Sequence, residues 1–299
     1  MILIDATVFS ILSTVFIIVV ATSVNVVYKV VAFTLLTSLL WLHGGEFLEF
    51  SYSQIFDGPN MYMIIYWILS LTMLVPIPFL ARPRASKTSI VLWRKFFHLI
   101  VLVLFVPPLV MHQGEFDGLL ALAGTLMLCL LVIMEVFRVV RKPWEKLSLL
   151  LNRLICPLLD HKDQTSSIVT SHLELLFAVV FPVWLALVVK GPFARRDYVI
   201  AGLVTVGVGD SAAAIGGMCL TAAPHKLPWP RHSKKSLEGF LSFLISTNTV
   251  LVFLGSWNYA SCFACIVAGL FEASMPKYDN AILPIAYSFS RLAFVRIRI

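Results

Sequence analysis

The chain has 299 residues and a mean hydropathy of +0.91, with 59% apolar and 13% charged residues. Soluble domains carry roughly 25% charged residues, so this composition excludes an ordinary soluble domain. The net charge of +7 suits a protein that meets anionic lipid head groups or a polyanionic nucleotide. We expect no nucleic-acid partner, because the sequence contains no basic soluble module.

Apolar runs recur along the whole chain. At roughly 20 residues a span they predict an all-α, polytopic integral membrane protein with about nine or ten transmembrane helices. The first run has no basic leader and no clear cleavage site, so we expect it to be retained as a span. The expected spans are residues 7–24, 25–42, 61–80, 93–111, 118–138, 171–190, 198–220, 237–255, 257–273 and 280–295.

Most lysines and arginines fall in alternate loops, within residues 82–95, 138–162 and 226–235. The excess of basic residues predicts that these loops are cytosolic. Residues 142–159 alternate charged residues with Leu and Trp, which predicts an amphipathic helix along the membrane surface. We divide the chain into N-terminal spans (1–80) and a membrane domain that carries the chemistry (81–299).

Two of the five cysteines, Cys262 and Cys265, form a C-x-x-C motif. A zinc site would need a second C-x-x-C or a suitably spaced histidine pair, and the sequence has neither. We therefore interpret these cysteines as small packing residues, and expect neither a disulfide framework nor zinc.

A glycine-rich run in the span at 198–220 contains the first candidate site. Gly207 and Gly209 precede Asp210 and Ser211. Glycines allow a backbone to approach a phosphate closely, although they equally allow helices to pack. Packing does not explain Asp210, because a carboxylate there is neutralised unless a cation or a donor meets it. A magnesium–nucleotide complex would supply that cation.

A second group lies at the start of the span at 237–255. Lys234, Lys235, Ser236, Glu238 and Gly239 combine two ammonium groups, a hydroxyl and a carboxylate. Helix N-terminal amides attract anions, and lysines offset the charge that develops in phosphoryl transfer. The alternative is a basic loop flanking the membrane, with Ser236 as a helix cap. Because Asp210 lies one loop earlier, we prefer a triphosphate site.

Two further charged groups lie at the ends of spans. Arg94, Lys95 and His98 follow one another, with Arg94 and His98 on one helix face. The alternative reading is that the basic residues reach along the helix to the membrane interface. Glu135 and Arg138 are spaced i, i+3, which suits a structural ion pair as well as a site.

A last group consists of Glu272, near the end of the span at 257–273, and of Asp279 and Asn280, which come after it in the next loop. Their side-chain oxygens could ligate a metal, or they could cap the last helix. The sequence leaves both interpretations open.

These groups, in this order, resemble motifs of the polyprenol kinase family, which covers dolichol, phytol and farnesol kinases. The stretch at 168–185 is most similar to dolichol kinases. The other matching pieces are R-K-x-x-H at 94–98, G-x-G-D-S at 207–211, K-K-S-x-E-G at 234–239 and D-N-x-x-x-P at 279–284.

The resemblance implies a CTP-dependent kinase of the endoplasmic reticulum membrane, with its active face in the cytosol. Such an enzyme phosphorylates the terminal hydroxyl of dolichol and so makes the dolichyl phosphate that carries glycans for protein glycosylation. The expected partners are dolichol, CTP and the lipid bilayer, and the expected cofactors are CTP and Mg²⁺.

The resemblance also implies roles for individual residues. The expected catalytic residues are Asp210, Glu238 and Asp279, with Asp210 and Asp279 as metal ligands, and Asp163 is carried over as a further acidic residue. Whether Asp210 or Glu238 accepts the hydroxyl proton stays open. The expected nucleotide-binding residues are Gly207, Gly209, Ser211, Lys234, Lys235, Ser236, Gly239, Arg94, Lys95 and His98.

Three other functions remain as alternatives. The first is a phytol- or farnesol-type kinase. The second is a CTP:lipid-phosphate cytidylyltransferase, which has a similar basic loop but releases pyrophosphate where a kinase releases CDP. The third is a transporter, for which pairs of broken helices at mid-membrane would be expected, whereas the charges here cluster at one face.

Overall fold

The structure is a computed structural model that describes residues 49–81, 87–111, 116–139, 144–155, 169–188, 195–220, 225, 235–275 and 279–297. Within these ranges the secondary structure is helical and no strand is present, so the all-α prediction is confirmed for them. The expected spans at 7–24 and 25–42 lie outside the described residues.

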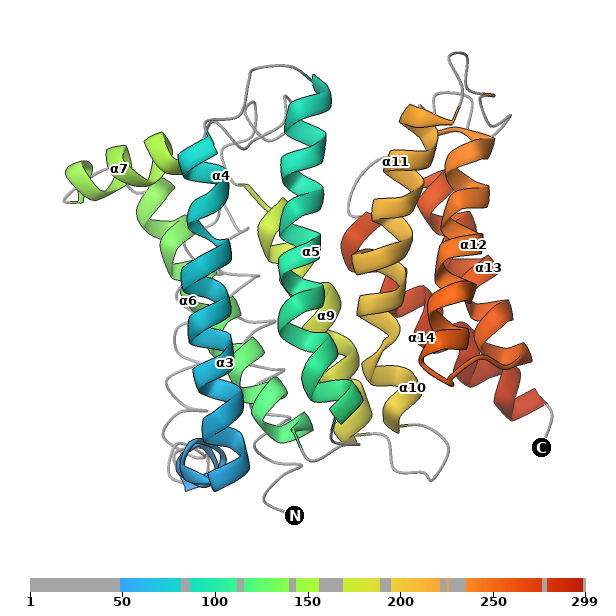
Figure 1. The fold of residues 1–299 in the computed structure, drawn as a ribbon, viewed down its shortest axis with the longest axis horizontal. Coiled ribbons are helices and arrows are strands. Elements are labelled where there is room, and N and C mark those ends of the chain that lie inside the picture. Colours follow the sequence, from blue (N-terminus) through green and yellow to red (C-terminus); the bar gives the residue numbers. More distant parts are fainter. Residues whose placement is uncertain are drawn as a thin grey trace, which may run out of the picture. The chain divides into compact units, whose positions relative to one another are not determined.

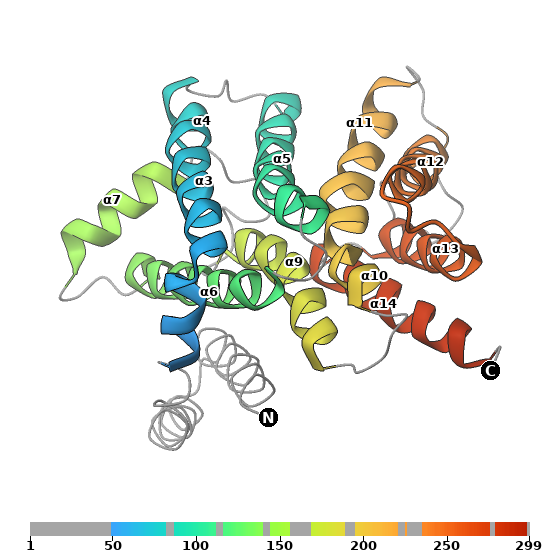
Figure 2. The same cartoon turned by 60° about the horizontal axis from the view of Figure 1, so that its bottom comes forward.

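The other eight expected spans each coincide with helical structure, drawn in Figures 1 and 2. The span at 198–220 is continuous through a short helix, a π-helix (η2) and an α-helix. The elements are α3 (Gly58–Leu74), α4 (Pro76–Ala81), α5 (Lys87–Met111), α6 (Asp117–Val139), α7 (Glu145–Ile155), α9 (Ser171–Val188), α10 (Arg195–Val199), η2 (Leu203–Asp210), α11 (Ser211–Cys219), α12 (Leu237–Phe253), α13 (Tyr259–Ser274) and α14 (Asp279–Ile297).

Four stretches of the described chain are long and apolar enough to cross a membrane: 58–78, 91–108, 117–139 and 197–219. Helices α9, α12, α13 and α14 are apolar but shorter. Together these helices indicate a multi-pass membrane protein. The count of nine or ten transmembrane helices stays a prediction.

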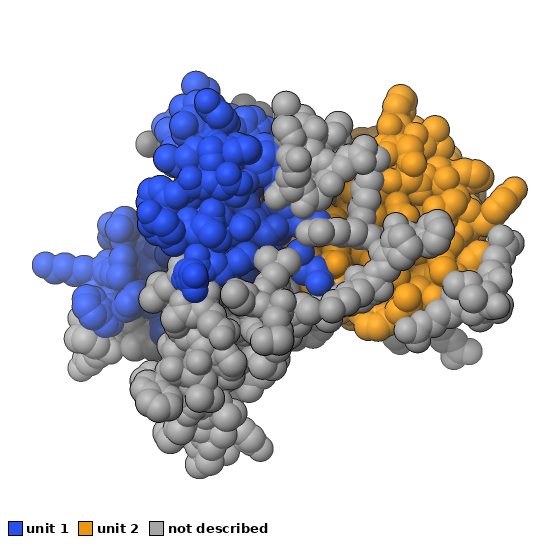
Figure 3. All heavy atoms as spheres, turned by 90° about the horizontal axis from the view of Figure 1, so that it is seen from below, with its two compact units in different colours: residues 1–93, 114–173, 187–190 blue, residues 94–113, 174–186, 191–299 orange. Residues whose placement is uncertain are grey.

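The chain forms two compact units, coloured separately in Figure 3. Unit 1 comprises residues 1–93, 114–173 and 187–190, and unit 2 comprises residues 94–113, 174–186 and 191–299. The two units therefore interleave along the sequence. The predicted division into N-terminal spans (1–80) and a membrane domain that carries the chemistry (81–299) was made on function, and it stays a prediction.

In unit 1 the amphipathic helix expected within 142–159 is present as α7. Ser148 and Leu151 are buried, whereas Leu149, Leu150 and Leu154 are exposed. Exposed leucines on a helix that also carries charges are typical of a helix at a membrane interface. The helix itself is confirmed over the described residues 145–155, and its position on a membrane stays a prediction.

Small residues bring the helices of unit 2 close together. Gly202 faces the backbone of α9: a Cβ added there would lie against the carbonyl oxygen of Ala178 and 2.8 Å from Val179 Cα. On α13, Ala264 and Ala268 are fully buried. Close backbone approach through small residues is the usual way in which helices associate in membranes.

The turn between α12 and α13 determines where α13 begins. Gly255 has a φ of +64°, which favours glycine, and the amides of Gly255 and Ser256 bond back to Val252 O and Leu251 O at the end of α12. Asn258 then caps α13 through a capping box. Both helix ends are thus specified locally, which fixes α13 beside α12.

We predict that Gly202→Ala lowers the free energy of unfolding by about 2 kcal/mol, because the added methyl group overlaps the α9 backbone. Denaturant unfolding of the purified protein in detergent measures the change. Gly58→Ala is the matched control, since no atom lies within 4 Å of its added Cβ. Equal stability of the two variants would show that the α9 contact is not tight.

Candidate functional site

The candidate site in unit 2 centres on Asp210, at the junction of η2 and α11. Asp210 is buried, with 6% of its surface exposed. The eight residues before α11 form a π-helix, a rare conformation that often marks functional sites. The apolar helix 197–219 has a carboxylate at its first residue and one in its interior, Asp210. The π-helix ends at this interior carboxylate.

Helix α5 supplies two basic groups to Asp210. Lys95 Nζ forms an ion pair and hydrogen bond with Asp210 Oδ2, and His98 Nε2 lies 3.2 Å from the same oxygen. A lysine of the chain itself thus compensates this carboxylate, and the binding of a magnesium–nucleotide complex here stays a prediction. Two motifs that are 115 residues apart in sequence meet at one oxygen.

The ring of His98 is held in a defined orientation. Its Nδ1 lies 2.9 Å from the backbone carbonyl oxygen of Arg94, and because a carbonyl only accepts, Nδ1 donates its proton. The ring nitrogen that faces Asp210, Nε2, is buried and lies within ion-pairing distance of the Asp210 carboxylate. The ring is thus held between the Arg94 carbonyl and Asp210, and any proton on Nε2 is directed at the carboxylate.

Ser211, the residue after Asp210, has a buried polar atom. Its Oγ has no hydrogen-bond partner among the described residues. Buried polar groups in proteins are nearly always satisfied by protein, water or ligand. The Ser211 hydroxyl can therefore accept a water or a polar ligand as its partner.

A second lysine–carboxylate pair links α12 and α13. Lys235 directly precedes α12, and its Nζ lies 2.5 Å from Glu272 Oε1 near the end of α13. The Glu272 side chain is 4% exposed and that of Lys235 is 31% exposed. Lys235 is also near enough to add to the electrostatic attraction at Asp210.

The sequence singles out Glu272 together with Asp279 and Asn280, but the predicted site assigns it no role. The sequence signal was present, because Glu272 is the one carboxylate in the otherwise uncharged α13. Its partner, however, lies 37 residues away and on another element. Only the packing of α13 against α12 brings the two charges together.

The predicted phosphate-binding glycines lie at helix contacts. An added Cβ would lie 2.7 Å from Leu102 at Gly207 and 2.6 Å from the Phe243 ring at Gly209. At Gly239 it would meet a backbone carbonyl of α11 at 2.9 Å. These glycines thus permit close packing of α5, α11 and α12 around Asp210, and their contact with a nucleotide stays a prediction.

Ser236 and Glu238 organise the start of α12. Ser236 is the N-cap, and its hydroxyl accepts a hydrogen bond of 3.2 Å from the Gly239 amide. Glu238 accepts from the backbone amide of His225 at 3.1 Å and lies 2.6 Å from its ring Nδ1. The Leu237 amide bonds back to His225 O. Glu238 thus ties the start of α12 to His225, 13 residues earlier in the sequence.

Arg94 lies on α5 and is half-buried. Three other predicted groups, Lys234, Asp163 and the side chain of Asp279, lie outside the described part of the chain. Among the described residues, no group of three His, Cys, Asp or Glu is arranged to hold a metal by itself. The metal pair of Asp210 and Asp279 stays a prediction.

Several curated proteins are similar to this chain, and they are dolichol kinases. The chain is 29% identical to the dolichol kinase EVAN of Arabidopsis thaliana over 249 residues, which cover 78% of this chain and 41% of that protein. It is 29% identical to the human dolichol kinase over 268 residues (83% and 46%). It is 27% identical to the dolichol kinase sec59 of Schizosaccharomyces pombe over 272 residues (83% and 51%).

The chain spans about half or less of the length of these curated relatives. No family model matches the sequence, and no solved structure matches it. The resemblance to the dolichol kinases is confirmed by relatives from plants, animals and yeast.

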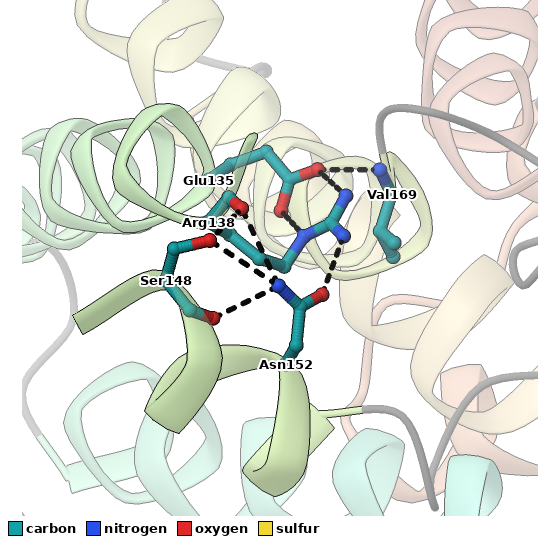
Figure 4. A network of polar contacts seen from close by, with 5 residues as sticks. All are labelled: Glu135, Arg138, Ser148, Asn152 and Val169. Atoms are coloured by element: carbon teal, nitrogen blue, oxygen red, sulfur yellow. Dashed lines mark hydrogen bonds and ion pairs between the residues drawn. The ribbon is translucent and has the colours of Figure 1, made fainter. Parts of the chain in front are cut away.

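The fourth candidate group, Glu135 and Arg138, forms a separate network in unit 1 (Figure 4). Arg138 Nε and Nη2 donate to both Glu135 oxygens at 2.7 and 2.6 Å. Glu135 also accepts from the Val169 amide, and Arg138 also donates to Asn152 on α7. Of the two interpretations, the structural ion pair is the one that this network favours, because it joins α6 to α7 and to the start of α9.

We predict that Glu135→Gln lowers the free energy of unfolding by about 3 kcal/mol, because it leaves Arg138 buried without its anion. Thermal unfolding in detergent measures this loss. Glu49→Gln serves as the control, since Glu49 is exposed. A Glu135→Gln variant as stable as the control would contradict the structural interpretation.

Proposed function

We propose that this chain, which is related to the dolichol kinases, carries the phosphoryl-transfer site of a lipid-alcohol kinase. The reaction transfers the γ-phosphoryl group of CTP to the terminal hydroxyl of dolichol and releases CDP. The single observation that carries the proposal is the meeting of Lys95 and His98 with Asp210, to which Lys235, from a third segment of unit 2, adds electrostatic attraction. Those segments are the ones whose motifs resemble the polyprenol kinases.

The lysines suit the phosphates of the donor. Phosphoryl transfer depends mainly on positioning and on neutralising phosphate charge. The side chains of Lys95 and Lys235 are 15% and 31% exposed, whereas their carboxylate partners are buried. An incoming phosphate can therefore reach the ammonium groups and share them with the carboxylates.

Asp210 suits a magnesium ion that arrives with the nucleotide. Mg²⁺ is commonly held by one or two carboxylates together with substrate phosphates, and Asp210 supplies one carboxylate. When bound, the ion would neutralise phosphate charge. Asp279 is the proposed second carboxylate.

Of the two candidate proton acceptors, Asp210 is the better one. Glu238 is engaged with the amide and ring of His225. Asp210 instead lies at the junction of η2 and α11, with His98 Nε2 3.2 Å from its Oδ2. We assign the hydroxyl proton to this pair, with Asp210 accepting it and His98 fixing the carboxylate.

The lipid substrate fits the surroundings of the site. Helices α11 and α12, which flank Asp210, carry exposed apolar residues such as Ile215 and Ile245. In a membrane such faces meet hydrocarbon, so a polyisoprenoid tail can lie against them. The dolichol substrate follows from the names of the relatives, whereas CTP, the endoplasmic reticulum and a cytosolic active face follow from the family resemblance.

An assay with the purified chain in lipid vesicles tests the reaction. It uses CTP or ATP labelled in the γ-phosphate, with dolichol, phytol and diacylglycerol as acceptors. We expect label in dolichyl phosphate and release of CDP. Pyrophosphate release would instead identify a cytidylyltransferase, and label in phytyl phosphate alone would identify a phytol-type kinase.

We predict that Asp210→Asn lowers the turnover number by at least about a hundredfold, the loss expected when a proton acceptor is removed. Glu238→Gln should lower it by less than about tenfold, because a lost hydrogen bond costs only about 1 kcal/mol. Steady-state assays of both variants, with their insertion into membranes checked, measure the contrast. An active Asp210→Asn, or an inactive but folded Glu238→Gln, would reverse the assignment.

A further inference from the structure

We propose that Glu272 is a positioning residue that holds the ammonium group of Lys235 at the phosphate-binding site. The inference rests on the proposed function, and it adds a residue that lies in none of the motifs that resemble the polyprenol kinases. Glu272 contacts Lys235 and acts on the nucleotide through it.

The packing of α13 against α12 delivers Glu272 to Lys235. One turn before Glu272, Gly269 lets α13 approach α12 closely: an added Cβ would lie 3.1 Å from Phe240 and 3.2 Å from Phe243. The locally specified turn at Gly255 sets the start of α13. The Glu272 carboxylate therefore reaches the beginning of α12, where Lys235 directly precedes the N-cap.

Burial makes the Glu272 carboxylate a rigid anchor. A buried charge in a membrane helix is costly and is compensated only by a partner with good geometry. Lys235 provides that partner at 2.5 Å, while part of its own side chain stays exposed. A carboxylate fixed by a helix thus restrains an ammonium group that a phosphate can still reach.

Lys235 needs such a restraint. A lysine side chain is long and flexible and loses rotamer entropy when it is ordered, and Lys235 lies outside the helix, directly before the N-cap of α12. Fixing its ammonium before the ligand arrives removes that entropy from the cost of binding. The Lys95–Asp210 pair fixes the second lysine of the site in the same way.

The simpler interpretation is an ion pair that merely joins α12 to α13. The two interpretations differ in what the loss of Glu272 changes. A purely structural pair would alter stability and leave nucleotide affinity intact, as we expect for Glu135 in unit 1. A positioning pair would weaken nucleotide binding, and would do so only while Lys235 is present.

The test measures kcat and KM for CTP and for dolichol in the full chain reconstituted in vesicles. The variants are Glu272→Gln, Glu272→Asp, Lys235→Ala and the double variant Lys235→Ala/Glu272→Gln, with Glu135→Gln as the matched control. We expect Glu272→Gln to raise the KM for CTP about tenfold, with the KM for dolichol unchanged. Glu272→Asp should lie between it and the wild type, because its carboxylate is one methylene shorter.

In the Lys235→Ala background, Glu272→Gln should change the KM for CTP by less than about twofold, because residues that act as one unit are not additive. If the two substitutions raise the KM for CTP by the product of their separate effects, or if Glu272→Gln leaves that KM unchanged, the positioning role of Glu272 is overturned. The proposed function would then still stand. A wild-type chain that neither binds CTP nor phosphorylates dolichol would overturn the proposed function as well. If Glu272→Gln does not fold, Glu272→Asp decides, and a wild-type KM for CTP in that variant contradicts the positioning role.

Discussion

The cost of burying a carboxylate among apolar helices is the constraint on which this site depends. Asp210 and Glu272 are both buried, and each is paired with a lysine from another part of the chain. An uncompensated charge at either position would be expensive. Correct packing of unit 2 and assembly of the two ion pairs are therefore the same event, so that folding itself sets two ammonium groups in place.

The small residues of unit 2 allow its helices to pack closely enough for these ion pairs to form. Gly207 and Gly209 bring α5 and α12 against the π-helical segment, and Gly269 brings α13 against α12. Each contact shortens the distance between charged groups that are far apart in sequence. The glycine-rich run thus contributes to the chemistry by letting the helices that carry Lys95, Lys235 and Glu272 approach one another.

Much of this arrangement could be predicted from the sequence. Apolar runs located eight helices, because burial in a bilayer demands continuous apolar segments, and the isolated charge of Asp210 marked the site. The ion-pair partners of the buried carboxylates could not be predicted, because the pairing of Glu272 with Lys235 depends on helix packing. The pattern K-K-S-x-E-G instead directed the prediction to Glu238, whose carboxylate binds His225. Sequence spacing reports neighbours along a helix, whereas these pairs lie between helices.

Lys95 and Lys235 together are proposed to bind the phosphates of a nucleotide. The decisive measurement is equilibrium binding of Mg-CTP and of cytidine to the purified chain and to its folded Lys95→Gln/Lys235→Gln variant. We predict that the wild type binds Mg-CTP and not cytidine, and that the variant loses the binding of Mg-CTP. Equal binding of Mg-CTP by both proteins would contradict the account.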